Sequence, residues 1–188
     1  YGRAGNSESA RSKLVAQALG FPWYFIEYNE SAWGDFYYSQ AYKEYLVHAE
    51  RGVSEPCTQP VPAILQISRR YGGGVCIPGH ALDFSAGSPL GSLQKRTYTR
   101  KEWIEYILKT HYNLNKRGVG VRETEKWTSG VPDVLTREDW VREYQKWEWK
   151  NRQSKFIAND VRAYEFSGYS WEMPFWDWRV CEFWRHVP

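Results

Sequence analysis

Cysteine is scarce in this chain, and its spacing suits neither a disulfide framework nor a structural zinc site. The 188 residues include three cysteines, Cys57, Cys76 and Cys181, with no Cys-x-x-Cys pair among them. Small secreted domains use even sets of cysteines, and structural zinc sites use closely spaced pairs. We therefore expect reduced thiols and a cytoplasmic protein.

Long apolar runs and charge clusters of one sign are also missing. No stretch approaches the ~18 consecutive apolar residues of a membrane span, and no secretory signal pattern opens the chain. The 25 basic and 22 acidic residues are interspersed, whereas a nucleic-acid-binding face needs clustered positive charge. We expect neither a membrane span nor a nucleic-acid partner. No internal repeat or low-complexity segment stands out.

Aromatic residues, in contrast, are abundant. Aromatic side chains make up 18% of the chain and include 11 tryptophans and 14 tyrosines. This composition excludes a disordered chain, and 188 residues suffice for one domain with a sizeable core. Both ends of the sequence begin or stop within apolar or helical patterns, so we expect a fragment of a longer protein.

The first half of the chain alternates helix and strand signals. Apolar spacing predicts helices through residues 14–19, 31–46 and 63–71, and continuous apolar runs predict buried strands over 22–28 and 75–77. Ser7 or Ser9 is the expected cap of the first helix, and Gly20 is suited to its end. Repeated helix, strand and glycine turn favours an α/β fold with a parallel sheet.

The second half is expected to be mainly helical. Thr99 and Thr136 are suited to begin helices, and residues 118–132 read as a polar connection between them. Asp177 is the expected N-cap of a last helix. The inner face of the helix after Thr136 is expected to carry four aromatic residues: Trp140, Tyr144, Trp147 and Phe156. The picture is a truncated parallel-sheet core over residues 1–92, followed by a helical part over 93–188.

The run over residues 72–88 is the candidate site. A short apolar strand enters a turn bounded by Gly79 and Gly87, where backbone can approach an anion closely. Asp83 can hold a Mg²⁺ ion that bridges phosphate oxygens, and His80 can donate a hydrogen bond. Ser85 and Ser88 add hydroxyl donors. The alternative is an ordinary glycine turn, in which an aspartate only bonds its own backbone.

A family resemblance favours the site. Residues 79–88, Gly-His-Ala-Leu-Asp-Phe-Ser-Ala-Gly-Ser, resemble the Gly-Glu-Gly-Ala-Asp-Glu-Leu-Phe-Gly-Gly segment of the asparagine synthetase family's ATP-dependent domain. Residues 1–9, Tyr-Gly-Arg-Ala-Gly-Asn-Ser-Glu-Ser, and residues 173–177, Met-Pro-Phe-Trp-Asp, are similar to segments before and after it. The likeness is strongest to asparagine-synthase-related proteins of surface-polysaccharide biosynthesis, within the PP-loop ATP pyrophosphatase superfamily.

The resemblance implies a fold, a reaction and a set of residues. The fold would be an adenine nucleotide alpha-hydrolase-like core, and the reaction would adenylate a carboxyl or amide oxygen for displacement by ammonia or an amine. ATP and Mg²⁺ are the implied cofactors, a small molecule the substrate, and a separate glutaminase or other ammonia source the partner. The implied ATP and pyrophosphate contacts are Gly2, Arg3, Gly79, His80, Asp83, Gly87 and Ser88, with Asp83 as metal ligand and Arg162 toward the substrate.

The chain also departs from the family pattern. The PP-loop motif Ser-Gly-Gly-x-Asp-Ser is absent, and the family's downstream lysine would fall beyond Pro188. His80 and Phe84 replace two acids of the turn, and Glu172 stands where the family has arginine. The fragment is therefore expected to be incomplete and inactive alone, or a degenerate member without ATP chemistry.

A different class of function remains open. Exposed tryptophans near Trp171, Trp176 and Trp178 would favour a carbohydrate-binding or scaffolding module, because indole faces stack on sugar rings. Arg162 is equally suited to a surface ion pair with Asp160. The three remaining histidines show no ligand spacing and are given no role: His48, His111 and His186.

Overall fold

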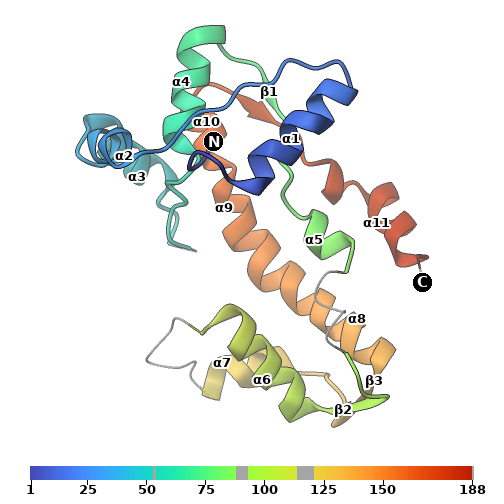
Figure 1. Cartoon of the computed structure of the whole chain (residues 1–188). Helices are drawn as coiled ribbons and strands as arrows, with labels where there is room; N and C mark the ends of the chain where they lie inside the picture. Colours follow the sequence, from blue (N-terminus) through green and yellow to red (C-terminus); the bar gives the residue numbers. More distant parts are fainter. Residues whose placement is uncertain (53, 88–92, 114–120, 188) are drawn as a thin grey trace. The chain divides into compact units, whose positions relative to one another are not determined.

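The computed structural model describes residues 1–52, 54–87, 93–113 and 121–187, and the fold is mixed α/β with mainly helical content (Figure 1). Contacts group the chain into two compact units. Unit 1 comprises Tyr1–Pro78 and Ala158–Met173, and unit 2 comprises Gly79–Ile157 and Pro174–Pro188. The division of one domain into parts 1–92 and 93–188 remains a prediction. The two units are defined by contacts, and each combines separate stretches of the chain. Among the described helices, none is long and apolar enough to cross a membrane.

Unit 1 joins helices to a short parallel sheet. Its elements are α1 (Ser7–Ala18), α2 (Glu30–Tyr37), α3 (Gln40–Ala49), α4 (Val61–Tyr71), β1 (Val75–Cys76), α9 (Ala158–Asp160), α10 (Arg162–Phe166) and β4 (Ser170–Trp171). The first helix is confirmed, but its cap is Asn6, whose Oδ1 accepts the Ser9 N–H at 2.7 Å. Gly20 follows α1 with a φ of 71°, as expected of a glycine just past a helix end.

Two predictions in unit 1 are wrong. The helix expected over 31–46 is broken into α2 and α3, because the Ser39 hydroxyl accepts the Tyr42 N–H and begins a new helix there. Residues 22–28 form no strand beyond an isolated bridge at Glu27. Their aromatic character fits a buried strand, yet Tyr24 lies more than half exposed. A strand needs at least one neighbouring strand to pair with, which apolar composition alone does not supply.

The parallel pairing expected from the sequence is present in this unit. β1 pairs with β4 in parallel, with Val75 opposite Ser170 and Cys76 opposite Trp171. Glycine permits the approach of the two chains, since a Cβ at Gly73 would lie 2.6 Å from the Gly168 carbonyl oxygen. The observed sheet in these residues has two strands.

The core of unit 1 lies where α10 packs against α3 and α4. Tyr45 is fully buried, its hydroxyl donates to the Cys57 carbonyl at 2.7 Å, and its ring lies 5.4 Å from that of Phe166. Ser68 on α4 donates its hydroxyl to the Ser167 carbonyl at 2.8 Å. Residues far apart in the sequence therefore hold β4 beside β1.

Unit 2 is mainly helical, and so are the described residues within 93–188, the part for which the sequence predicts helices. Its elements are α5 (Leu82–Ser85), β2 (Thr97–Thr99), α6 (Arg100–His111), α7 (Val121–Thr128), β3 (Val134–Thr136), α8 (Arg137–Glu148), the π-helix η2 (Trp149–Ile157), the 3-10 helix η3 (Pro174–Trp176) and α11 (Trp178–Arg185). Thr99, Thr136 and Asp177 are confirmed as N-caps. The connection expected over 118–132 is wrong in part, because α7 forms within it.

Unit 2 contains an internal βα repeat that sequence inspection missed. In each copy a three-residue strand ends at a threonine that caps the next helix, and the first turn reads Thr-Arg-x-acid-Trp, from Thr99 to Trp103 and from Thr136 to Trp140. β2 and β3 pair antiparallel about Tyr98 and Leu135, which occupy equivalent places in the two copies. The two strands of the repeat are therefore related by a local two-fold axis through this pair. Only a short stretch matches, which explains why it escaped notice.

An aromatic core fills the space between the two copies. The two repeat tryptophans, Trp103 and Trp140, are buried and pack with residues of α6 and α8. The buried members are Leu93, Trp103, Ile107, Val131, Leu135, Trp140, Tyr144 and Trp147. Three of the four aromatic residues expected on this face are buried, but Phe156 is 40% exposed, because η2 rotates its side chains away from the α-helical period.

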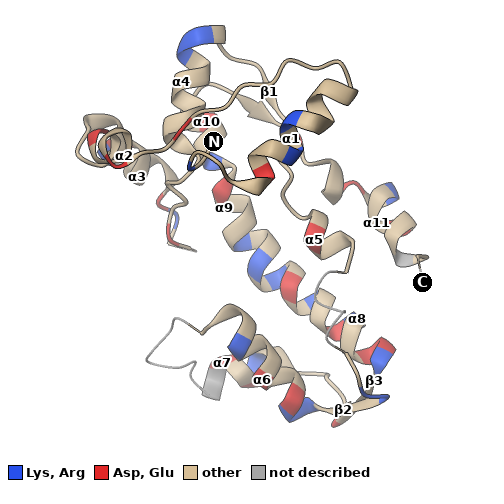
Figure 2. Cartoon of the chain, in the orientation of Figure 1, with Lys and Arg blue, Asp and Glu red and all other residues tan. Residues whose placement is uncertain are grey.

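Basic and acidic residues are interspersed along α8 (Figure 2). On α8, Arg142 pairs with Asp139 and Glu143, and Lys146 pairs with Glu143 at 2.8 Å. The Arg142–Asp139 and Lys146–Glu143 pairs join residues one helical turn apart, where opposite charges are mildly stabilising. The interspersed charge seen in the sequence is therefore largely taken up in local pairs on this helix.

Candidate functional site

The 79–87 turn follows β1 directly in the chain and is built on a strained residue. Ala81 has a φ of 70°, the left-handed region that residues other than glycine rarely adopt. The Ala81 carbonyl accepts the Ser85 N–H at 2.9 Å, which starts the single turn of α5. Gly87 closes the segment with a φ of 72° and donates its N–H to the Phe84 carbonyl. The loop thus has a defined backbone rather than a simple glycine linker.

The structure brings four of the predicted turn residues together in this segment. Gly79 is exposed, and a Cβ built on it would meet open space. His80 is half-buried, and Asp83 is exposed in the first turn of α5. Ser88 lies outside the described residues.

Gly2 and Arg3 belong to unit 1, whereas the turn belongs to unit 2. Gly2 bridges to Glu27 in parallel, donating its N–H to the Ile26 carbonyl at 3.1 Å and accepting the Tyr28 N–H at 2.8 Å. Its φ of 140° requires glycine. Both of its backbone polar groups are therefore engaged within the protein, whereas the side chain of Arg3 is exposed.

The turn is anchored to η2 and η3. The Ser85 hydroxyl donates to the Phe175 carbonyl at 3.1 Å, and the ring of Phe84 lies 5.8 Å from that of Trp149. Trp176 packs edge-on against Trp149 at 5.7 Å. Phe84, which replaces an acid of the family pattern, therefore serves as a packing residue here.

A buried polar network lies on the same helix as Trp149, and the sequence analysis missed it. Glu148 is 2% exposed, and its Oε1 accepts bonds from Arg152 Nη1 at 2.9 Å and from Gln153 Nε2 at 3.2 Å. The Gln153 Oε1 in turn accepts the Trp176 indole N–H at 3.2 Å. The sequence signal for this network is the i,i+4 spacing of Glu148 and Arg152. Because the two residues lie within an aromatic segment, the sequence predicts only a helix face that packs in the core.

Electrostatics connect His80 to this network. Burial lowers the pKa of His80 below its ordinary value, and the positive charge of Arg152 lowers it further. A histidine with a lowered pKa is neutral at pH 7 and carries one N–H donor. His80 is therefore suited to donate a hydrogen bond rather than to supply a positive charge.

Arg162 is held in an ionic cluster of unit 1. Its Nη1 lies 2.6 Å from Glu165 Oε2, and Glu165 Oε1 accepts the Trp171 indole N–H at 3.0 Å. His48 approaches the same carboxylate at 3.9 Å, and burial and Arg162 lower its pKa. Asp160, the partner considered from the sequence, is only 6% exposed, so the expectation that a pair with it lies at the surface is wrong.

Asp83 suits a metal that arrives with a ligand better than a resident one. In the described ranges, no group of three or more His, Cys, Asp or Glu side chains is placed to hold a metal ion. Mg²⁺ commonly takes one or two carboxylates and completes its shell with phosphate oxygens and water. The exposed Asp83 carboxylate, in a turn that also contains the open Gly79, fits that donor set.

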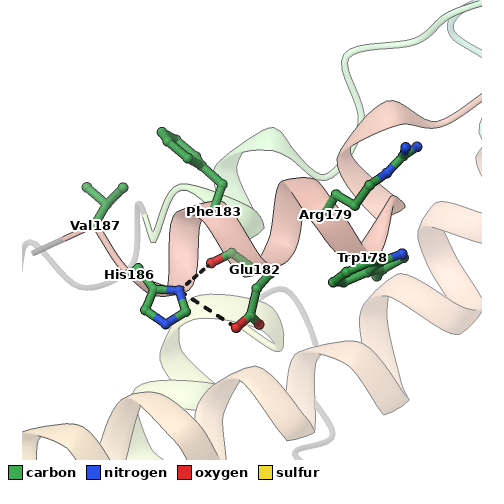
Figure 3. Close-up of a pocket in the computed structure, with 6 residues that line it drawn as sticks. All are labelled: Trp178, Arg179, Glu182, Phe183, His186 and Val187. Carbon is green, nitrogen blue, oxygen red and sulfur yellow. Dashed lines mark hydrogen bonds and ion pairs between the residues drawn. The ribbon is translucent and has the colours of Figure 1, made fainter.

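A hollow of about 490 Å³ lies on α11 (Figure 3). Its lining residues are Trp178, Arg179, Glu182, Phe183, His186 and Val187. Trp178, Glu182 and His186 project from one side of the helix, and Phe183 projects from the other. Trp178 is 72% exposed, whereas the indole N–H groups of Trp171 and Trp176 are both used in internal hydrogen bonds. One of the three tryptophans considered for sugar stacking is therefore available.

Comparisons of the chain with models of protein families, with curated proteins and with solved structures found no match.

Proposed function

We propose that this chain is part of an ATP-dependent, adenylate-forming ligase domain similar to those of the asparagine synthetase family. The observation that carries the proposal is the 79–87 turn, which follows a strand of a parallel pair and carries the exposed Asp83 carboxylate four residues after the open backbone of Gly79. In parallel α/β sheets, ligands bind beyond the carboxyl ends of strands. A turn of this composition at that point is suited to phosphate.

The proposed chemistry assigns separate tasks to the turn residues. Backbone at Gly79 and Gly87 borders the pyrophosphate, Asp83 would hold Mg²⁺, and His80 donates a hydrogen bond to a phosphate oxygen. When bound, Mg²⁺ neutralises charge on the phosphate oxygens. An acceptor carboxyl oxygen attacks the α-phosphorus and pyrophosphate leaves; ammonia or an amine then attacks the acyl carbon and AMP leaves.

The remaining assignments follow from the resemblance. Gly2 and Arg3 would lie toward the base or ribose, with Arg3 as the side chain that reaches it. Arg162 would face the acceptor, held in place by Glu165. A separate glutaminase or another ammonia source would supply nitrogen, and surface-polysaccharide biosynthesis in the cytoplasm would be the setting.

Binding of ATP tests this proposal without requiring turnover. We expect calorimetric titration to show ATP binding that depends on Mg²⁺, and Asp83→Asn to weaken it by ~10-fold or more, since charge-assisted contacts contribute about 1.5–3 kcal/mol. Asp35→Asn, which changes an exposed carboxylate on α2, is the matched control. Absence of binding by the unmodified chain would refute the proposal.

Sugar binding at the α11 hollow is a second candidate function. The exposed Trp178 indole gives it specific support, because Glu182 and His186 lie on the same side of the helix and can hydrogen-bond to hydroxyl groups (Figure 3). Titration with oligosaccharides should then change the tryptophan fluorescence, and Trp178→Ala should abolish the change while Trp23→Ala keeps it. An unchanged response in Trp178→Ala would exclude this site.

A further inference from the structure

We propose that Arg152 is the side chain that pairs with the pyrophosphate portion of the ligand at the 79–87 turn, and that Glu148 is its positioning residue. The inference rests on the proposed function and adds two residues to it that neither the turn motif nor the family resemblance contains. All of the residues involved belong to unit 2.

The first argument is the geometry of the guanidinium group. Glu148 Oε1 accepts Arg152 Nη1 at 2.9 Å, and the Phe156 ring lies 5.8 Å from the Arg152 Cζ. The carboxylate partner is 3% exposed, whereas the Arg152 side chain is 37% exposed. One end of the side chain is thus fixed by a buried acid, and its outer face remains open to solvent.

The Arg152 guanidinium group has N–H donors that make no hydrogen bond within the described residues. A guanidinium carries five N–H groups in a rigid fork that matches two oxygens of a phosphate. Across the described ranges, one of these groups makes a hydrogen bond, to Glu148. The remaining donors are sufficient for bidentate pairing with a phosphate oxygen pair.

The 79–87 turn packs against the start of η2. Phe84 packs on Trp149, and Ser85 bonds to the Phe175 carbonyl. Trp176 contacts the ring of Trp149 and the amide of Gln153, so these two η2 residues lie on one face. Arg152 adjoins Gln153, and its charge acts on His80 at the start of the turn.

Glu148 explains why the arginine is fixed rather than mobile. Its Oε1 accepts two bonds, from Arg152 and Gln153, and its Oε2 is buried without a hydrogen-bond partner. A buried carboxylate with unfilled acceptor capacity holds a cation strongly, because leaving it uncompensated is costly. An arginine fixed in this way needs less ordering when it meets an anion.

Calorimetric titration of the full chain with Mg²⁺ and inorganic pyrophosphate tests the inference. Arg152→Gln should weaken pyrophosphate binding by ~10- to 100-fold, and Arg152→Lys, which keeps the charge but loses the fork, should recover part of it. Arg142→Gln is the matched control. Arg142 pairs with Asp139 on α8, and its replacement should leave pyrophosphate binding unchanged. Equal binding by Arg152→Gln would overturn the proposal.

A second readout separates positioning from mere folding. Pyrophosphate bound near Arg152 should raise the pKa of His80, which NMR titration of the His80 ring measures. In a Glu148→Gln variant of unchanged thermal stability, pyrophosphate should raise this pKa by less. If Arg152→Gln does not fold, the double variant Glu148→Gln with Arg152→Gln is used instead, because it leaves no buried charge unpaired. Its pyrophosphate binding should be weaker than that of the unmodified chain. Binding as strong as that of the unmodified chain would contradict the inference. Failure of the unmodified chain to bind either ATP or pyrophosphate would refute the proposed function itself.

Discussion

His111 joins the aromatic core of unit 2 to its buried polar network. Its Nε2 lies 2.9 Å from the Tyr144 hydroxyl oxygen, and its ring packs at 4.9 Å from Trp147. Burial lowers its pKa from the ordinary value of 6.5, Arg152 lowers it further, and Glu148 opposes this effect in part. The folded protein therefore prefers neutral His111.

This preference predicts weaker folding in acid. Below pH 6.5 the unfolded chain binds a proton that folded His111 resists, so the free energy of unfolding falls as pH falls toward the lowered pKa of the folded state. Denaturant unfolding at pH 7.5 and 5.5 measures the loss. His111→Gln should reduce the difference in stability between the two pH values, and His186→Gln, at the exposed residue that follows α11, is the control. An equal loss in all three proteins would contradict the assignment.

Ala81 predicts a second local effect. A side chain branched at Cβ fits poorly at a φ of 70°, whereas glycine adopts it freely. Ala81→Val should therefore lower the free energy of unfolding by about 2 kcal/mol, and Ala81→Gly should change it by less than about 1 kcal/mol. Urea denaturation checks the order, and equal stability of the two variants would show that the turn relaxes.

Each copy of the βα repeat begins its helix with a capping box. The Thr99 hydroxyl accepts the Glu102 N–H, and Thr136 does the same with Asp139. Thr99→Ala and Thr136→Ala should each cost about 1 kcal/mol of stability in urea denaturation. Thr110→Ala, at an exposed position within α6, should have almost no effect. A similar cost at Thr110 would remove the capping explanation.

The β1–β4 pair makes a stricter demand. A methyl group at Gly73 would lie 2.6 Å from the Gly168 carbonyl oxygen, and this clash should make Gly73→Ala destabilising by about 1–3 kcal/mol. Gly79→Ala, with open space around its Cβ, is the matched control. Thermal unfolding compares the two, and a neutral Gly73→Ala would mean that the strands can separate at no cost.

Local signals explain which elements were predictable. Thr99, Thr136 and Asp177 were found because a cap depends on a few adjacent residues. Residues 22–28 were misread because strand pairing depends on distant segments, and the break at Ser39 was missed because aromatic spacing continued across it. The repeat was missed because its two copies share little beyond their first helical turns.

The candidate site was predictable only in part for a similar reason. The glycines and Asp83 of the turn stand together in the sequence, so composition was enough to select them. Arg152 and Glu148 lie far along the chain from the turn, and packing of Phe84 against Trp149 brings their helix to it. Contacts of this kind carry no local sequence signal.

At the scale of the whole molecule, two units with separate cores predict separable losses of stability. Trp103 is fully buried in unit 2, and Trp103→Ala should cost about 3–5 kcal/mol there. Hydrogen exchange should show lost protection in α6 and α8, with α3 and α4 of unit 1 retained. Equal loss in both units would show that they unfold as one.

The proposed function requires that the 79–87 turn binds the phosphate groups of ATP. NMR mapping of backbone amide signals, as Mg²⁺ and pyrophosphate are added, tests this requirement. The amides of Gly79, His80 and Gly87 should shift, together with the Arg152 side-chain signals, while those of α11 stay in place. Shifts confined to α11, or none at all, would contradict it.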